Sequence, residues 1–194
     1  MKIFVIRHGE TPSNAARIVQ TPETPLSARG IEQAERLARR LGNSGIGQIL
    51  SSDLPRAMMT AQRLEIATGA PLRHDPLLQE RNFGDVRGTA YSDLDGDLFA
   101  ADFHPPNGES WATFDTRVTR AWELVADVAA ATTGNLAVVT HGLVCASLAR
   151  QHFTLRADVN PPQHFENTSV TIVAGASPWL VSTLNCDAHL DADQ

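Results

Sequence analysis

Short apolar runs alternate with longer amphipathic segments along most of this chain, and that alternation limits the folds it can adopt. Residues 2–6, 46–53 and 136–142 have the length and apolar character of strands. Residues 27–42 and 111–129 instead repeat apolar side chains at helical spacing. Because strands that alternate with helices build a largely parallel sheet, we predict an α/β fold with helices on both faces.

Capping residues mark the ends of two predicted helices. Ser27 is a favourable N-cap for the first helix, and Gly42 is a favourable residue to end it. Asp53 is expected to cap the second helix, where Pro55 is tolerated because it lies in the first turn. The other predicted elements are a short strand at 71–74, a helix at 143–151 and closing strands at 169–175 and 178–185.

Residues 81–109 break the pattern of alternating elements. This segment carries glycines, two adjacent prolines and scattered acids, with little periodicity. Irregular segments of this length in a compact fold usually serve as lids or binding loops. We therefore predict a single domain over residues 1–194, with a small lid at about 81–109.

Composition excludes several classes of function. A net charge of −6 argues against a general nucleic-acid or anionic-membrane binder. The chain has no apolar stretch near the ~20 residues of a membrane span, and it opens on a strand rather than a signal peptide. Cys145 and Cys186 show no pairing pattern, which suits a reducing compartment, so we expect a cytoplasmic protein. The sequence shows no apolar surface stripe that would indicate a subunit interface. It therefore leaves open whether the protein is a monomer or a homodimer.

Polar residues stand where predicted strands end. Two strands end in His-Gly, at His8 and His141, and Arg7 precedes the first histidine. The strand at 46–53 leads into Arg56, in the first turn of a helix whose N-terminus favours anions. Ligands of open α/β sheets bind outside the carboxyl ends of the strands. We therefore expect these four side chains to converge on one anion.

Two arginines and two histidines around one point suit a phosphoryl group, whose oxygens spread negative charge in the transition state. Arg7 and Arg56 each offer paired N–H donors. One histidine can act as nucleophile if it is neutral and its far ring nitrogen donates to a carbonyl, while the other stays protonated. Glu80 is the candidate acid for the departing alkoxide, because a shielded site beside phosphate would raise its pKa.

Each of these residues could also have a purely structural role. Taken singly, the two site histidines could be structural, and the two arginines could pair with surface carboxylates. Glu10, Asp53 and Asp85 are rival acids for the role of Glu80. The other histidines are expected at structural or surface positions, with His104 in the lid: His74, His104, His152, His164 and His189. No spacing typical of catalytic zinc is found, so we expect no metal and no other cofactor.

Six sequence blocks resemble the histidine phosphatase superfamily, the phosphoglycerate mutase-like group. They are "IRHGETPSN", "SSDLPRAMMTA", "LLQERNFGDVRG", "PNGESWATFDTRV", "VVTHG" and "WLVSTLNCDAHL", and they run from residue 2 to about 190. The resemblance implies a three-layer αβα fold and a phosphohistidine mechanism without metal. It implies a nucleophile at His8, phosphate clamps at Arg7 and Arg56, a second pocket histidine at His141, a proton donor at Glu80 and a phosphate contact at Asn14.

The chain departs from the family pattern at three places, which leaves the substrate open. The first block has an extra residue around Gln20, Arg87 stands within Val-Arg-Gly where the family often has Glu-Gly, and Leu143 replaces a frequent glycine. The lid is short and rich in acids, which would repel a second phosphate. We therefore expect a phosphatase acting on a small phosphomonoester, with mutase-type transfer and a non-catalytic phosphate-binding module as alternatives.

Overall fold

The described residues of this computed structural model, 1–191, build a seven-stranded sheet in the order β3-β2-β4-β1-β6-β7-β5. The strands are β1 (Lys2–Arg7), β2 (Ile46–Ser51), β3 (Leu72–His74), β4 (Asn135–Thr140), β5 (Phe153–Thr154), β6 (Val170–Ala174) and β7 (Trp179–Cys186). The pairings β1–β4, β2–β3, β2–β4 and β5–β7 are parallel, whereas β6 lies antiparallel to β1 and β7. The prediction of a mostly parallel sheet is confirmed.

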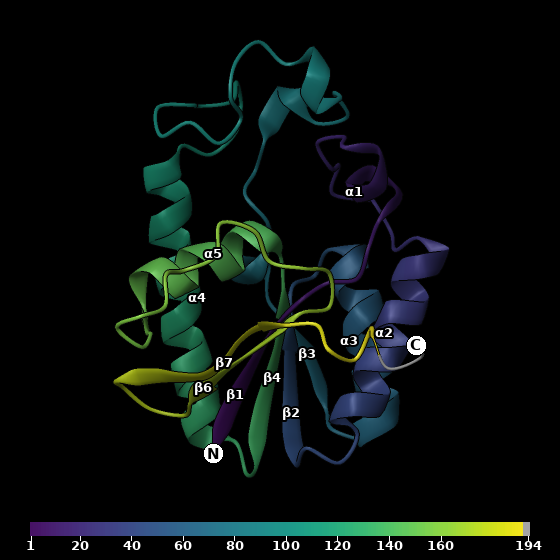
Figure 1. The fold of residues 1–194 in the computed structure, drawn as a ribbon, viewed down its shortest axis with the longest axis vertical. Coiled ribbons are helices and arrows are strands. Elements are labelled where there is room, and N and C mark those ends of the chain that lie inside the picture. Colours follow the sequence, from purple (N-terminus) through teal and green to yellow (C-terminus); the bar gives the residue numbers. More distant parts are fainter. Residues whose placement is uncertain (192–194) are drawn as a thin grey trace.

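Helices cover both faces of this sheet (Figure 1). The helices on the faces are α2 (Ala28–Leu41), α3 (Pro55–Thr68), α4 (Trp111–Ala131) and α5 (Gly142–Gln151), whereas the short α1 (Pro12–Ala16) lies away from the sheet. The helices α2 and α3 pack on one face, and α4 and α5 pack on the other. The three-layer αβα architecture is thereby confirmed.

The two apolar cores explain why the first strand is apolar without interruption. Ile3 and Val5 pack into the core beneath α4 and α5, while Phe4 and Ile6 pack into the core beneath α2 and α3. A strand buried on both faces needs apolar residues at every position rather than at alternate ones. Each such side chain contributes about 1.5–3 kcal/mol on burial, so β1 anchors both layers.

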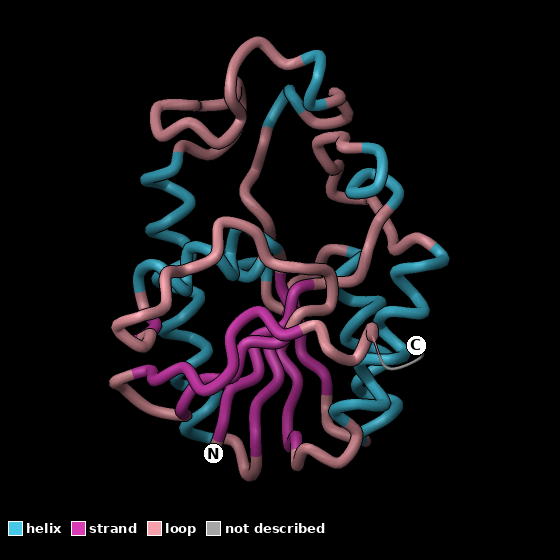
Figure 2. The backbone as a smooth tube through the Cα atoms, in the orientation of Figure 1, coloured by secondary structure: helices cyan, strands magenta, loops and turns pink. Residues whose placement is uncertain are grey.

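The lid at 81–109 lies beyond the carboxyl ends of the parallel strands and is built mainly of loops (Figure 2). Its regular structure is limited to the one-turn 3₁₀ helices η2 (Gly84–Val86) and η3 (Tyr91–Asp93). A small apolar cluster packs the lid against the segment after α1, with Phe83 and Leu98 of the lid buried together with Val19. An isolated β-bridge between Ile18 and Ala90 ties it to the segment after α1.

Several local features differ from the sequence predictions. Ser27 caps α2 and Gly42 follows its last residue, as predicted. The cap predicted at Asp53 is wrong: Leu54 occupies the N-cap of α3, and the Asp53 carboxylate accepts a hydrogen bond from Gln79 instead. The elements α1 and β5 and the 3₁₀ helix η1 (Pro76–Leu78) were not predicted, because they are too short to show periodicity. Within residues 1–191, no helix is long and apolar enough to cross a membrane.

Candidate active site

Parallel pairing of β1 with β4 brings the two His-Gly ends together. Arg7 is in register with Thr140, and the backbone N–H of His8 donates to the Thr140 carbonyl at 2.9 Å. The rings of His8 and His141 consequently lie with their centroids 5.1 Å apart, edge to face. The sheet therefore produces the convergence that the two strand ends predicted.

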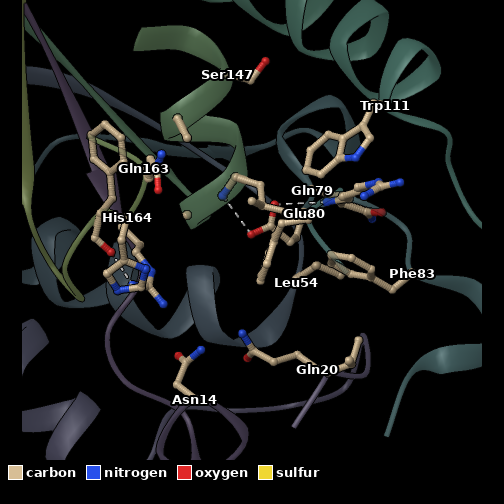
Figure 3. A pocket seen from close by; sticks show the side chains of 18 of the residues that line it. Asn14, Gln20, Leu54, Gln79, Glu80, Phe83, Trp111, Ser147, Gln163 and His164 are labelled. Atoms are coloured by element: carbon tan, nitrogen blue, oxygen red, sulfur yellow. Dashed lines mark hydrogen bonds between the residues drawn. The ribbon is translucent and has the colours of Figure 1, made fainter. Parts of the chain in front are cut away.

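A cavity of about 850 Å³ opens beside this histidine pair. Figure 3 shows Glu80 near its centre, with Phe83 and Trp111 on one side of it and His164 on the other. His8 and His141 are 1% and 0% exposed, so they lie in the protein beside the cavity rather than in its wall. The predicted site residues that line the wall are Arg7, Asn14, Arg56 and Glu80.

His8 is held neutral with one ring nitrogen unprotonated. Its Nδ1 lies 2.7 Å from the Gly9 carbonyl oxygen, which can only accept, so Nδ1 carries the proton. Burial, and then the positive charges of Arg56 and Arg7, hold the pKa of His8 well below its ordinary 6.5. Nε2 therefore keeps a lone pair, which is the form that a nucleophile requires.

The residue after His8 has to be glycine. A Cβ atom at Gly9 would lie 2.5 Å from the carbonyl oxygen of Gly30, in the first turn of α2. The same glycine supplies the carbonyl that accepts the proton of His8 Nδ1. The His-Gly pair is thus a packing requirement as well as a chemical motif.

His141 presents an unpaired donor. Its Nε2 lies 2.9 Å from Ser52 Oγ, and Ser52 Oγ already accepts from the backbone N–H of Leu54. The Ser52 hydroxyl proton has no other acceptor among residues 1–191, so we assign it to Nε2, which places the proton of the neutral ring on Nδ1, a buried atom without a partner. We expected this ring to stay protonated, but burial and then Arg56 and His8 hold its pKa well below 6.5.

Arg7 and Arg56 are buried, and each has an N–H donor without a partner among residues 1–191. Arg7 Nη1 contacts the Phe165 carbonyl and His164, and Arg56 Nη1 donates to the Thr21 carbonyl at 3.2 Å. The Nε atoms of both arginines are buried without a partner among residues 1–191. Desolvation lowers the pKa of both guanidinium groups, and that of Arg56 falls only to about 10, so Arg56 stays charged at neutral pH. Buried donors of this kind are normally satisfied, and an anion would satisfy them.

Glu80 carries a carboxyl group that burial favours in the protonated form. Desolvation raises its pKa, against the opposing effects of the Leu143 and Arg81 N–H donors and of the two site arginines. The direction agrees with our expectation of a shielded carboxyl group, since burial is the largest cause of the shift. The rival acids lie elsewhere: Glu10 accepts from Ser27 and faces Arg29, Asp53 accepts from Gln79, and Asp85 accepts from Asn107.

Arg117 forms a support for Glu80 that sequence reasoning missed. Its guanidinium donates to both carboxylate oxygens of Glu109 at 2.8 Å and to the backbone carbonyls of Leu77, Gln79 and Glu80. These bonds fix the backbone that carries Glu80. No local motif signals them, because the partners come from α4 and from a segment about 40 residues earlier.

The walls of the cavity revise the expectation of an acidic lid. Of the acids between Gly84 and Trp111, Asp97 lines the cavity. Glu109 does not line it and forms an ion pair with Arg117. The three positions that depart from the family pattern, Gln20, Arg87 and Leu143, all line the cavity.

The remaining five histidines occupy three kinds of position. His164 was expected outside the site, but it lines the cavity and contacts Arg7. His189 lies outside the cavity wall but is buried, at 8% exposure, and contacts Thr168. The others lie outside the cavity wall: His74, His104 and His152. Among residues 1–191, no cluster of three or more histidine, cysteine, aspartate or glutamate side chains is arranged to hold a metal ion.

An αβα fold with paired histidines, paired arginines and one buried carboxyl at the strand ends defines a phosphoglycerate mutase-like protein. This chain belongs to the histidine phosphatase superfamily, branch 1, whose sequence signature matches residues 3–185.

Relatives cover nearly the whole chain. A protein of Serratia proteamaculans named "Probable phosphoglycerate mutase GpmB" is 30% identical over 210 residues, covering 98% of this chain and 95% of that one. The crystal structure of phosphoglycerate mutase from Thermus thermophilus has a TM-score of 0.72 at 31% identity, covering 94% of this chain and 97% of that one. A mycobacterial glucosyl-3-phosphoglycerate phosphatase has a TM-score of 0.79 at 27% identity, covering 95% and 99%.

Proposed function

We propose that this protein is a metal-independent phosphatase that hydrolyses a phosphomonoester through a phosphohistidine on His8. The observation that carries this proposal is the state of the His8 ring. Its Nδ1 proton is bound to the Gly9 carbonyl, and its low pKa keeps the ring neutral, so Nε2 is an available nucleophile at neutral pH. A structural histidine would not need a buried lone pair next to two arginines.

The first chemical step forms the phosphoenzyme. Nε2 of His8 attacks phosphorus, the bond between phosphorus and the alcohol oxygen breaks, and protonated Glu80 gives its proton to that oxygen. Arg7, Arg56 and the Nδ1–H of His141 are the donors for the phosphoryl oxygens. Donors that are already in place stabilise the transition state without reorganising.

The second step releases inorganic phosphate. Water attacks the phosphorus on His8, and Glu80, now a carboxylate, takes the proton from that water. The bond between phosphorus and Nε2 breaks, His8 returns to its neutral form, and Glu80 ends protonated as it began. The same carboxyl group thus serves as acid and then as base, which its raised pKa permits.

Mutase-type phosphoryl transfer is the second candidate, because one observation favours it. Arg87 lines the cavity, and its guanidinium has no hydrogen-bond or ion-pair partner among residues 1–191, so it is available to a second anionic group. The relative from Serratia is also named as a probable mutase. We favour the phosphatase because the lid is short and because Asp97 and the aromatic Phe83, Tyr91 and Phe99 share the cavity wall.

The test of the proposed function is phosphate release from p-nitrophenyl phosphate with EDTA present, followed by a panel of phosphomonoesters. We expect release that EDTA leaves unchanged. Loss of activity with EDTA would contradict the metal-free mechanism. No release from any phosphomonoester would reject the phosphatase, and conversion of 3-phosphoglycerate to 2-phosphoglycerate would then identify a mutase, while phosphate binding without turnover would identify a binding module.

Replacing Arg56 separates an enzyme from a binding module. Arg56→Ala should lower kcat/KM for p-nitrophenyl phosphate by about 10²–10³-fold, because it removes a preorganised donor to the transition state. Arg63→Ala, on the same helix but paired with Glu35 at the surface, is the matched control and should stay within about twofold. An Arg56→Ala protein that loses phosphate affinity but keeps its kcat would contradict a catalytic role for this side chain.

A further inference from the structure

A directed chain of hydrogen bonds runs from α2 to the segment beside His8. Arg40 Nη1 lies 3.1 Å from His189 Nδ1, and because a guanidinium only donates, Nδ1 accepts. Burial, and then the charge of Arg40, lowers the pKa of His189 to about 4, so the ring is neutral and its proton lies on Nε2. Nε2 therefore donates to Thr168 Oγ1 at 2.9 Å, and the Thr168 hydroxyl donates to the Asn167 carbonyl at 2.7 Å.

Thr168 needs this support because its backbone is strained. It has φ 58°, in the left-handed region that a β-branched residue rarely adopts. Such a conformation typically costs about 1–3 kcal/mol and persists only when the surroundings hold it. The Thr168 side chain is fully buried, and its hydroxyl oxygen accepts a hydrogen bond from His189, which supports this conformation from the side-chain end.

Thr168 in turn forms a hydrogen bond to the backbone of His8, the proposed nucleophile. The His8 carbonyl accepts from Thr168 N at 3.3 Å and from Asn167 Nδ2 at 3.0 Å. The N–H of the same peptide unit, which belongs to Gly9, donates to Thr60 Oγ1 at 3.1 Å. The peptide is therefore held at both its oxygen and its nitrogen.

The orientation of this peptide decides where Nε2 of His8 points. His8 Nδ1 is bound to the carbonyl of Gly9, the next group along the chain, so a rotation of the His8–Gly9 peptide would carry the imidazole with it. Misplacement of a reacting atom by about 1 Å can cost on the order of 10²-fold in rate.

We propose that His189, held by Arg40, is a positioning residue that maintains Thr168 in its left-handed conformation and thereby orients His8. The ring nitrogens of His189 are bound to Arg40 and to Thr168, so His189 acts through Thr168 and not on the substrate. The proposal rests on the proposed function of His8 as nucleophile.

The test uses four proteins: wild type, His189→Ala, Thr168→Gly and the double variant. Glycine adopts a positive φ without strain, so Thr168→Gly should remove the need for His189. We expect His189→Ala to lower kcat for p-nitrophenyl phosphate by about tenfold or more with KM within about threefold, and to shift the ¹⁵N signals of the His8 ring. Thr168→Gly and the double variant should both stay within about threefold of wild type. His74→Ala, at an exposed position on β3, is the control and should change neither readout.

Either of two results would overturn the proposal. One is a His189→Ala protein that is less stable but keeps wild-type kcat and His8 ring signals. The other is a loss in kcat that persists in the Thr168→Gly background. If His189→Ala does not fold, the double variant decides between the two roles. A double variant that is folded and active supports the proposal. A double variant that does not fold shows that His189 serves the fold alone. If wild type hydrolyses no phosphomonoester, the proposed function fails, but the ring signals still decide whether His189 orients His8.

Discussion

His8→Ala is expected to abolish phosphate release, with a loss in kcat on the order of 10⁴- to 10⁶-fold. The variant removes the lone pair that forms the bond to phosphorus, and the nearest other imidazoles, His141 and His164, have their Nε2 lone pairs engaged by Ser52 and Arg7. His141 presents Nδ1–H rather than a lone pair, because its Nε2 is occupied by Ser52. The residual rate should be close to that of the uncatalysed reaction assisted by binding alone.

The covalent intermediate gives this prediction a second readout. Wild type mixed with substrate and quenched in alkali should carry an alkali-stable, acid-labile phosphate, visible by ³¹P NMR, and His8→Ala should carry none. His104→Ala is the matched control, because this lid histidine is exposed and lies outside the cavity wall. It should retain both label and activity. Persistence of the label in His8→Ala would place the nucleophile elsewhere.

Glu80→Gln is expected to have the second largest effect, and its size should depend on the leaving group. General acid catalysis contributes about 10²–10⁴-fold when the leaving alkoxide is a strong base. An alkyl phosphate should therefore lose about that factor in the phosphoryl-transfer step. p-Nitrophenolate leaves without a proton, so the same step should be nearly unchanged for p-nitrophenyl phosphate.

Pre-steady-state kinetics checks the Glu80→Gln prediction. With p-nitrophenyl phosphate the variant should release one equivalent of p-nitrophenol in a burst and then turn over slowly, because the base that activates water is missing. Asp85→Asn, whose exposed carboxylate accepts from Asn107, is the control and should behave as wild type. An equal loss for alkyl and aryl esters, without a burst, would contradict the acid and base roles of Glu80.

The two pKa shifts also set the pH dependence of the wild-type enzyme. The pKa of His8 is lowered well below 6.5, so the nucleophile stays unprotonated as the pH falls through the ordinary histidine range. The pKa of Glu80 is raised, so its acid form persists to higher pH than an exposed glutamate allows, and the rate should fall as the pH rises through that raised pKa. For alkyl phosphates we expect this alkaline limb to disappear in Glu80→Gln.

Much of the fold follows from local sequence. Uninterrupted apolar runs predicted the central strands, since a strand buried on two faces has no polar position, and Ser27 and Gly42 predicted the ends of α2. Short elements without periodicity, such as α1 and β5, were not predictable in this way. The Asp53 cap failed because Gln79, from the segment that precedes the lid, competes for its carboxylate.

The sequence by itself determined the αβα architecture and the residue types at the strand ends, because both depend on patterns that local spacing carries. Tertiary structure alone decided which states those residues adopt. The neutral rings of His8 and His141 and the raised pKa of Glu80 come from desolvation, which only packing produces. The supports from Arg117 and His189 likewise join groups far apart in the chain, and side-chain hydrogen bonds over such separations leave no local pattern to read.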